Sequence, residues 1–512
     1  MSWRSASKVP RWTKVHIGDL NNPSLKMYCD RKSSKICFSC DMETKEFRQA
    51  AHQLVDWMAD YMENTDRYDV KPAIRPGAIK NQLPASAPIE GEDFQKLFHD
   101  FNSIILPGMT HWQHPQFFAY FPTGASGPSI LAEMLASTLG AQCMIWLTSP
   151  AAEELEERMM EWLRDMLGLP SSFTGVIQDS SSTATLVALL TAREKKSDYQ
   201  INKNGFINNR FRVYTSAQAH SSVDKDVKIA GFGINNLIKI QVDENFAMIP
   251  EALQEAIELD VQQGFTPLCV VSTIGTTSST AIDPIAAIAK ICLQYACWHH
   301  IDASYAGTAL LLPEMRWMSK GVENCDSFVV NPHKWMFTNF DCSAYFVKDK
   351  KALINTFAIL PEYLKTPEDH LVNNYRDWGI PLGRRFRALK LWFVIRSYGL
   401  RRLQEIIREH ITFGQWLKEK VIAARNFELL APVPLNLVCF RYKPDGVTDE
   451  KELEEINSKL LQTLNASGKI LVTQTKLNDK YAIRFVGGSE KTTLEHVQQG
   501  WRRVEQTARE LK

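Results

Sequence analysis

Apolar and polar positions follow two different periods along the middle of the chain. Short apolar runs predict buried strands; they lie at Phe211–Thr215, Leu237–Val242, Leu268–Ser272, Trp298–Asp302, Ser327–Val330 and Cys342–Val347. Between them, apolar residues recur at helical spacing, as in Pro250–Val261 and Pro284–Tyr295. Strands that alternate with helices predict an α/β fold with a mainly parallel sheet covered on both faces.

The pattern changes toward both ends of the chain. A helical period begins at Thr44, and a proline-rich connector follows at residues 71–88. A further helix is predicted from Ser149 as N-cap and Pro150 in the first turn to Gly168 at its end. Beyond residue 390, long charged helices such as Leu400–Ala424 give way to short strands and a final helix. These changes predict four segments: an extension at 1–40, a helical, dimer-forming segment at 41–125, a large domain at 126–389 and a small α+β domain at 390–512.

The composition excludes several classes of function. The 512 residues include 59 basic and 58 acidic side chains, so the net charge is +1 and favours neither a nucleic-acid surface nor a membrane anchor. No apolar run approaches the roughly 18–20 residues of a membrane helix. Ten cysteines are scattered without regular spacing; Cys37 and Cys40 have the spacing of half a zinc site, but no second pair lies nearby. The cysteine pattern therefore predicts a reduced, cytoplasmic protein without a metal site.

Lys334 is the residue that is hardest to explain by structure alone. It follows the apolar run Ser327–Val330 within Asn331-Pro332-His333-Lys334-Trp335, where a hydrated ammonium is unusual. A desolvated lysine has a depressed pKa, and its neutral amine can form an imine with an aldehyde. The alternative is a lysine whose stem is buried while its ammonium reaches solvent.

Asp302 closes the preceding strand candidate, so parallel pairing brings it to the same edge of the sheet as Lys334. A lysine for the imine and an aspartate for the ring nitrogen are what a pyridoxal phosphate enzyme requires. The alternative is an aspartate that caps the turn after the strand.

Residues 175–183 join a short strand to a helix through Asp179, three serines and Thr183. Hydroxyl groups and backbone N–H groups at a helix N-terminus bind anions, so this stretch predicts a phosphate site. Serine is also a common N-cap, and Thr277, after Gly275 at the end of another strand, offers one more hydroxyl.

Three further stretches carry candidate site residues. His220 follows the strand ending near Thr215, where it is placed to stack on a ring or to accept a proton, although a lone histidine is more often structural. Residues 111–122 contain five aromatic residues and predict either a ligand-binding wall or ordinary core. Tyr363 lies in the polar, proline-bounded stretch 359–370, which predicts either a mobile lid or a surface loop.

Together these motifs resemble the group II pyridoxal-phosphate decarboxylases, most closely the aromatic-L-amino-acid decarboxylases. The resemblance covers roughly residues 42 to 510. It rests on the aromatic wall at 112–122, Ser149-Pro150-Ala151, the stretch 175–191, Ala219-His220-Ser221-Ser222, residues 302–307, residues 331–335, residues 339–344 and Pro381-Leu382-Gly383-Arg384-Arg385-Phe386.

The resemblance implies a fold-type I homodimer with a mainly parallel seven-stranded sheet, and with active sites shared at the subunit interface. It implies that Lys334 forms the imine with pyridoxal 5'-phosphate, that His220 stacks on the ring and that Asp302 pairs with its nitrogen. The lid tyrosine, Tyr363, would return a proton to the substrate. Cofactor binding would involve Ser181, Ser182, Thr277, Ser304, Asn331 and His333.

On the substrate side, the resemblance implies a lining of Trp112, Tyr120, Phe121, Pro122, Thr123 and Gly383, with Gln142 and Met144 from the partner subunit. Gln142 and Met144 depart from the apolar and aromatic residues of the animal enzymes. In the plant branch, a glycine at the position of Gly383 accompanies indole substrates.

The predicted function is therefore decarboxylation of an aromatic L-amino acid: dopa, tyrosine, tryptophan, 5-hydroxytryptophan or phenylalanine. One alternative is an aromatic aldehyde synthase, whose members carry phenylalanine at the lid position or asparagine at the stacking position; Tyr363 and His220 favour simple decarboxylation. A second alternative is a histidine or glutamate decarboxylase, which Gly383 and the aromatic wall disfavour. A binding module without activity would require the loss of Lys334 or Asp302, and both are present.

Overall fold

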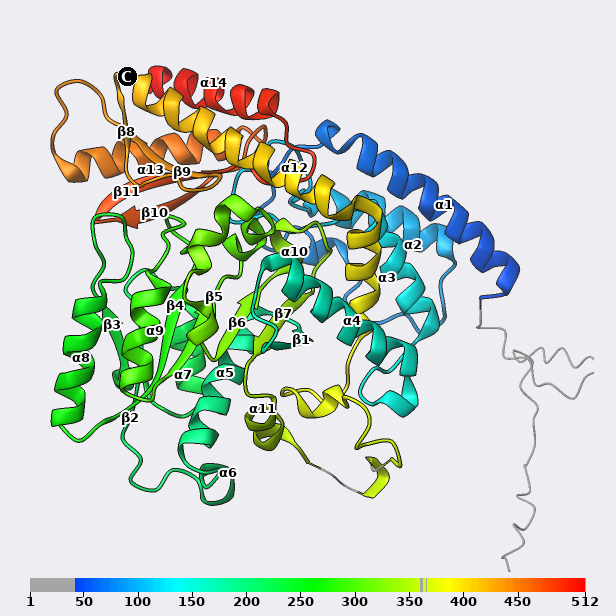
Figure 1. The fold of residues 1–512 in the computed structure, drawn as a ribbon. Helices are drawn as coiled ribbons and strands as arrows, with labels where there is room; N and C mark the ends of the chain where they lie inside the picture. Colours follow the sequence, from blue (N-terminus) through cyan, green and yellow to red (C-terminus); the bar gives the residue numbers. More distant parts are fainter. Residues whose placement is uncertain (1–41, 360–361, 365, 512) are drawn as a thin grey trace, which may run out of the picture.

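A computed structural model describes residues 42–359, 362–364 and 366–511, with the backbone but not the side chain of Tyr363 (Figure 1). The predicted extension at 1–40 lies outside the described residues. Within the described ranges, no helix is both long and apolar enough to cross a bilayer.

A seven-stranded sheet forms the centre of the molecule, in the order β1-β7-β6-β5-β4-β2-β3. Only β7 runs against its neighbours, which confirms the predicted mainly parallel α/β sheet. The strands are β1 (Thr174–Gln178), β2 (Phe211–Ser216), β3 (Leu237–Ile240), β4 (Thr266–Thr273), β5 (Trp298–Asp302), β6 (Ser327–Val330) and β7 (Ser343–Val347).

Helices cover both faces of this sheet because successive strand residues alternate between two cores. Val213 of β2 packs in one core with α5 (Ser181–Lys196), α7 (Ser222–Ile229) and α11 (Lys350–Phe357). Its neighbour Tyr214 packs in the other with α8 (Pro250–Gln262) and α9 (Ile285–Gln294). The helix α4 (Pro150–Leu167) contacts β1, and the short α6 (Ile201–Asn204) contacts α5.

The helix α4 begins and ends where the sequence predicts. Pro150 occupies its first turn, and Gly168 ends it with a φ of 71°, a left-handed conformation that glycine adopts without a steric penalty. Ser149 stands at the N-cap position, but its hydroxyl does not cap the helix; it donates a hydrogen bond of 3.1 Å to the carbonyl of Gln142.

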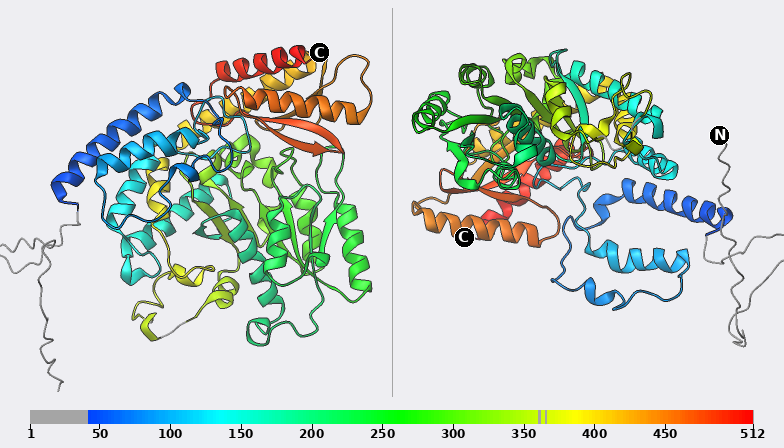
Figure 2. Two further views of the ribbon diagram at one scale, coloured as in Figure 1. Left: turned by 180° about the vertical axis from the view of Figure 1, so that it is seen from behind. Right: turned by 90° about the horizontal axis from the view of Figure 1, so that it is seen from below.

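An N-terminal arm stands apart from the sheet layers (Figure 2). It contains α1 (Thr44–Glu63) and α2 (Phe94–Asp100), which contact each other through the Trp57 ring against Phe98 and Phe101. The helix α3 (Gly127–Leu139) follows and packs against α12.

A smaller antiparallel sheet follows the long helix α12 (Arg387–Ala423), which is interrupted at Gly399 with a φ of 68°. Its strand order is β10-β11-β9-β8, and α13 (Glu450–Ala466) and α14 (Leu494–Glu510) pack beside it. The strands are β8 (Phe427–Leu429), β9 (Leu437–Tyr442), β10 (Thr473–Leu477) and β11 (Lys480–Val486).

Candidate active site

The carboxyl ends of the parallel strands meet at one edge of the large sheet. There Asp302, the last residue of β5, is in register with Thr273 of β4 and Val329 of β6. A cavity of about 190 Å³ opens at this edge. It is lined by predicted site residues from several elements: Phe121, Ser181, Ser182, His220, Thr277, Asp302, Ser304, Asn331, His333 and Lys334.

Lys334 lies in the short helix α10 (Pro332–Trp335), directly after β6. Its backbone N–H donates to the carbonyl of Asn331 at 3.0 Å, and its Nζ lies 5.7 Å from the centre of the Phe121 ring. Burial lowers the pKa of Lys334 from its ordinary value, and the negative charge of Asp302 opposes that shift. The lysine is therefore set up to release its proton and act as a nucleophile.

Asp302 is only 6% exposed, yet its carboxylate accepts specific hydrogen bonds. The backbone N–H of Ser304 donates to Oδ1 at 3.0 Å, and the Ser304 hydroxyl donates to the same oxygen. Such donors stabilise a buried negative charge. This arrangement can hold a carboxylate against a cationic partner in the cavity.

The N-terminus of α5 forms the polar wall of the cavity. The Ser180 hydroxyl accepts the N–H of Thr183 at 3.2 Å and so caps the helix. Ser181 donates to Oδ1 of Asn331 at 2.5 Å, and its hydroxyl oxygen lies 2.7 Å from the Ser304 hydroxyl oxygen. Hydroxyl groups and the free N–H groups of this first turn favour an anion, as in phosphate sites.

Two histidines line the cavity with one ring nitrogen already engaged. Nδ1 of His220 accepts the N–H of Ser222 at 3.1 Å, and Nδ1 of His333 accepts the N–H of Cys342 at 2.9 Å. Burial lowers the pKa of both rings, that of His333 to about 3, so neutral rings are favoured. Each neutral ring then carries its hydrogen on Nε2, which is left as a donor.

The aromatic wall is built across two distant parts of the chain. Phe121 stacks on Tyr305 with 3.8 Å between ring centres, and the Tyr305 hydroxyl donates to Asn436 at 2.9 Å. Arg484 of β11 also contacts this wall, with its guanidinium carbon 5.4 Å from the Phe121 ring centre. Arg484 is 4% exposed and donates to the Thr277 carbonyl at 2.7 Å.

The other aromatic-wall residues expected on the substrate side lie outside this cavity. The Trp112 ring stacks on Tyr120, with 5.7 Å between centres, and Tyr120 is half exposed. Pro122 is buried, and the carbonyl of Thr123 accepts a hydrogen bond from Gln113 at 2.7 Å. Within one subunit, Phe121 is therefore the member of this set that faces Lys334.

Gln142, Met144 and Gly383 form a separate group, here called the Gln142 cluster, which does not line the Lys334 cavity. Oε1 of Gln142 accepts the N–H of Arg384 at 2.7 Å, and a Cβ atom at Gly383 would lie 3.1 Å from Nε2 of Gln142. The carbonyl of Met144 accepts the N–H of Arg376 at 3.0 Å. Gln142 and Gly383 are exposed, so this group faces outward.

Tyr363 lies in a 3₁₀ turn, Glu362–Leu364, within the stretch expected to be a lid. Its side chain lies outside the described residues. The adjacent Leu364 is buried, and its carbonyl accepts a hydrogen bond from Arg376 at 2.8 Å, so this part of the stretch is anchored to the body of the subunit.

Several cavity residues were not among those predicted from the sequence. They are Ser180, Ser222, Thr273, Gly275, Tyr305 and Phe340. Ser180, Ser222 and Tyr305 lie inside motifs that the sequence analysis quoted, although no role was assigned to their side chains. Phe340 lies in the quoted stretch 339–344, whereas Arg484 belongs to no quoted motif and reaches Phe121 only in the folded chain.

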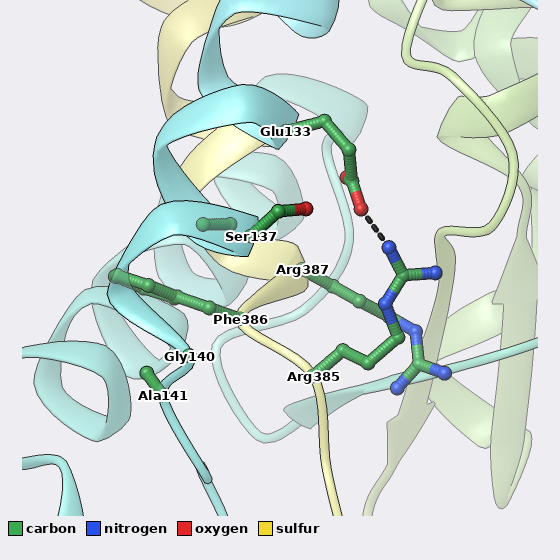
Figure 3. Close-up of a pocket in the computed structure, with 8 residues that line it drawn as sticks. Glu133, Ser137, Gly140, Ala141, Arg385, Phe386 and Arg387 are labelled. Atoms are coloured by element: carbon green, nitrogen blue, oxygen red, sulfur yellow. Dashed lines mark ion pairs between the residues drawn. The ribbon is translucent and has the colours of Figure 1, made fainter. Parts of the chain in front are cut away.

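A second, smaller hollow lies between α3 and the residues that lead into α12 (Figure 3). It measures about 80 Å³, and Glu133 and Arg385 form an ion pair across it. Its ionisable side chains are Glu133, Arg385 and Arg387, so it has no amine that could form an imine.

A family model described as "Pyridoxal-dependent decarboxylase conserved domain" matches residues 76–443. The chain is 42% identical over 482 residues to the aromatic-L-amino-acid decarboxylase of Mus musculus, covering 91% of this chain and 98% of the relative. It is 41% identical over 477 residues to the phenylacetaldehyde synthase of Arabidopsis thaliana, covering 91% and 96%.

The fold matches a crystal structure described as Oryza sativa TDC with PLP and tryptamine. The TM-score is 0.89 at 35% sequence identity, and the match covers 92% of this chain and 99% of that one. The large sheet and its helices therefore have the fold-type I architecture that the sequence predicts.

Proposed function

This chain belongs to the pyridoxal-dependent decarboxylase family, and on that premise we propose that it releases carbon dioxide from aromatic L-amino acids to form arylalkylamines. It is a carboxy-lyase with pyridoxal 5'-phosphate as its cofactor. The observation that carries the proposal is that Lys334, Asp302 and His220 line one cavity with the N-terminus of α5.

The donor set of the cavity fits this cofactor. Lys334 would hold the aldehyde carbon, Asp302 the ring nitrogen, and His220 would lie against the ring. The serine hydroxyls of α5, with Thr277, Ser304, Asn331 and His333, would hold the phosphate and the polar edge. When bound, pyridoxal phosphate supplies a protonated ring that accepts the electron pair left as carbon dioxide departs.

The chain's own residues have three tasks in this reaction. The lowered pKa of Lys334 favours a neutral amine that would carry the cofactor, and the hydrogen-bonded Asp302 carboxylate would face the ring nitrogen. The stacked pair of Phe121 and Tyr305 supports an apolar wall that suits an aromatic substrate and keeps water away. Tyr363, on the lid, would then return a proton to the substrate carbon.

A homodimer with shared sites is part of this proposal. The helix α3 exposes Leu131, Met134, Leu135 and Leu139, which lie on one face at helical spacing. An exposed apolar face of this kind indicates a protein interface, and a two-fold axis would use it twice. The outward-facing Gln142 cluster supports the idea that each subunit completes the substrate side of its partner's cavity.

The alternative hypothesis is an aromatic aldehyde synthase, because one relative of the chain is a phenylacetaldehyde synthase. Tyr363 and His220 favour the decarboxylase. The products separate the two: a decarboxylase releases one amine per carbon dioxide, whereas an aldehyde synthase also consumes oxygen and releases ammonia and peroxide.

Carbon dioxide release from dopa, tyrosine, tryptophan, 5-hydroxytryptophan and phenylalanine, with amine, aldehyde and peroxide measured together, tests the proposal. We expect amine and carbon dioxide in equal amounts from at least one of these acids. Lys334→Ala is expected to abolish turnover and the absorbance of the lysine-bound cofactor, whereas Lys320→Ala, an exposed lysine, leaves both unchanged. Turnover of histidine or glutamate alone, or full activity of Lys334→Ala, would contradict the proposal.

The cytoplasmic location stays a prediction. It is supported by the seven cysteines of the described residues, which are all buried and unpaired, as in a protein kept reduced. Cell fractionation with a membrane marker and a secreted marker checks it.

A further inference from the structure

A groove lies between α4 and residues 371–373, which directly follow the predicted lid stretch 359–370. Its main hollow measures about 450 Å³, and a neighbouring hollow of about 440 Å³ shares Glu157, Glu161 and residues 371–373 with it. None of the residues that line the main hollow lines the Lys334 cavity. The groove is therefore a feature separate from the site described above.

Glu153 forms part of the main hollow and is the most unusual side chain in it. It is only 4% exposed, and among the described residues neither carboxylate oxygen has a hydrogen-bond partner of normal geometry. A buried carboxylate without donors is costly, so such a group persists where something supplies a compensating partner. Burial, with the charge of Glu156, raises its pKa to about 8.

The two arginines that act on Glu153 form ion pairs with other acids, although Nη1 of Arg384 and Nε of Arg376 make no hydrogen bond within the described residues. Arg384 pairs with Glu156 at 2.6 Å, and Arg376 lies 3.3 Å from Asp377. Arg384, the Tyr375 backbone N–H and Arg376 act to lower the pKa of Glu153, yet burial outweighs them. The carboxylate is thus left for a partner from outside.

The rest of the hollow is also acidic. Glu154, Glu157 and Glu161 line it, and Arg158 is the one basic residue of the lining, paired with Glu161 at 2.7 Å. Negative charges that converge on a hollow favour a cationic ligand.

The apolar part of the lining indicates which kind of cation the hollow would bind. The Trp146 indole lines the hollow and donates to Glu154 at 2.9 Å, which fixes its ring, and Leu371 and Val372 lie among the other lining residues. A hollow of this size accommodates a small organic ligand. A carboxylate beside an aromatic ring and two aliphatic side chains suits an ammonium group attached to an apolar body.

We propose that this groove is a second binding site, for an arylalkylammonium ion whose ammonium group is held by Glu153 and whose ring lies beside Trp146. The choice of an aromatic amine rests on the proposed function, because such an ion is the product of that reaction. The site would thus sense the amine that the other cavity releases.

The pH dependence of binding follows from linkage. A cation stabilises the ionised form of Glu153, so below the pKa of about 8 the ligand must displace a proton. Affinity is therefore expected to rise with pH up to about 8 and to level off above it.

Calorimetry on the holoenzyme with N,N-dimethylphenethylamine tests the site. The neutral form of this tertiary amine carries no N–H hydrogen, so it cannot form an imine with the cofactor aldehyde. The amine stays protonated below about pH 9. We expect one probe per chain, and about tenfold or greater weakening in Glu153→Gln, because the negative charge that strengthens the hydrogen bond to the ammonium group is lost. Glu161→Gln, at a carboxylate already paired with Arg158, is expected to change affinity less than about threefold.

Three outcomes would overturn the site: no binding of the probe, equal affinity in Glu153→Gln, or an affinity that does not change between about pH 6.5 and 8.5. Equal binding of 1,4-diaminobutane would overturn the aromatic assignment. Glu153→Gln is nearly isosteric and is expected to keep its melting temperature and its carbon dioxide release. If no aromatic acid is decarboxylated while the probe still binds at Glu153, the proposed function fails and the site stands.

Discussion

At the scale of single residues, the proposed function makes the identity of the product depend on Tyr363. The carbon that loses carbon dioxide must be protonated before oxygen reaches it. A phenol on the lid, delivered as the lid closes, is suited to this task because general acids of this kind accelerate proton transfer by about 10²–10⁴-fold. Phenylalanine has the same shape and no proton to give.

Tyr363→Phe is therefore expected to lower amine formation by at least about tenfold and to raise the share of aldehyde, ammonia and peroxide. The measurement is amine against aldehyde per carbon dioxide released. Tyr295→Phe, which removes only a surface hydrogen bond to Glu258, serves as the control and is expected to behave as wild type. Amine at the normal rate from Tyr363→Phe would remove Tyr363 from the role of proton donor.

Residues at strand ends were predictable from the sequence, whereas the far wall of the cavity was not. Asp302 and Lys334 each follow an apolar run, and the parallel-sheet rule alone brings them to one edge. Arg484 comes from β11 of the small domain and reaches Phe121 only through tertiary packing. No spacing in the sequence signals such a contact.

At the scale of elements, the backbone that follows the aromatic wall lies close to the backbone of residues 333–337, which include Lys334. The N–H of Gly124 donates to the carbonyl of His333 at 2.9 Å. A Cβ atom at Gly124 would lie 2.5 Å from the backbone of Phe337, closer than any side chain can approach. Glycine at this position lets Phe121 and Lys334 share one cavity.

Gly124→Ala is expected to push these two segments apart and to destabilise the fold by about 1–3 kcal/mol, since overpacked sites cost that much. A lower melting temperature and weaker retention of the cofactor would be measured. Gly91→Ala is the matched control, because its Cβ atom meets nothing within 4 Å, and we expect a change within about 0.5 kcal/mol. Equal stability of the two variants would contradict this account.

The six strands of the large sheet that were predicted with bounds, and the helices Pro250–Val261 and Pro284–Tyr295, lie within two residues of their observed ends, because apolar runs and their periods are local signals. The strand Trp298–Asp302 is observed as predicted. The helix predicted from Leu400 instead belongs to α12, which begins at Arg387. The turn at Gly399 separates its two parts, and a glycine inside a charged helical pattern does not by itself reveal so sharp a break.

At the scale of the whole molecule, the exposed face of α3 is the strongest sign of assembly. Leu135 and Leu139 are 49% and 66% exposed and lie one turn apart. The arm formed by α1 and α2 also exposes Phe47, Val55 and Leu97, and contiguous exposed apolar side chains indicate a protein interface.

If the proposed dimer uses this face, Leu135→Lys is expected to shift the enzyme toward monomer in sedimentation analysis, because two buried lysines would face each other near a two-fold axis. Carbon dioxide release should fall with it, since the Gln142 cluster would no longer reach a neighbouring cavity. Leu293→Lys, on the exposed side of α9, is the control and is expected to leave both unchanged. A wild-type enzyme that sediments as a monomer with full activity would contradict the assembly.

The class of the fold was predictable at this scale, but the order of its strands was not. Alternating strands and helices predicted a mainly parallel sheet. The reversed direction of β7, and the position of β1 beside it, follow from long-range packing that local patterns do not encode.

The pairing of β1 with β7 brings Thr174 opposite Val347. In chain order, β1 and β7 are the first and the last strands of the large sheet. During synthesis on the ribosome, β1 emerges long before its partner and must wait with its edges unpaired. Contacts between such distant segments form slowly, and unpaired edges invite aggregation. The nascent chain is therefore expected to depend on chaperones until β7 has left the exit tunnel, and a truncation before residue 347 cannot complete the sheet.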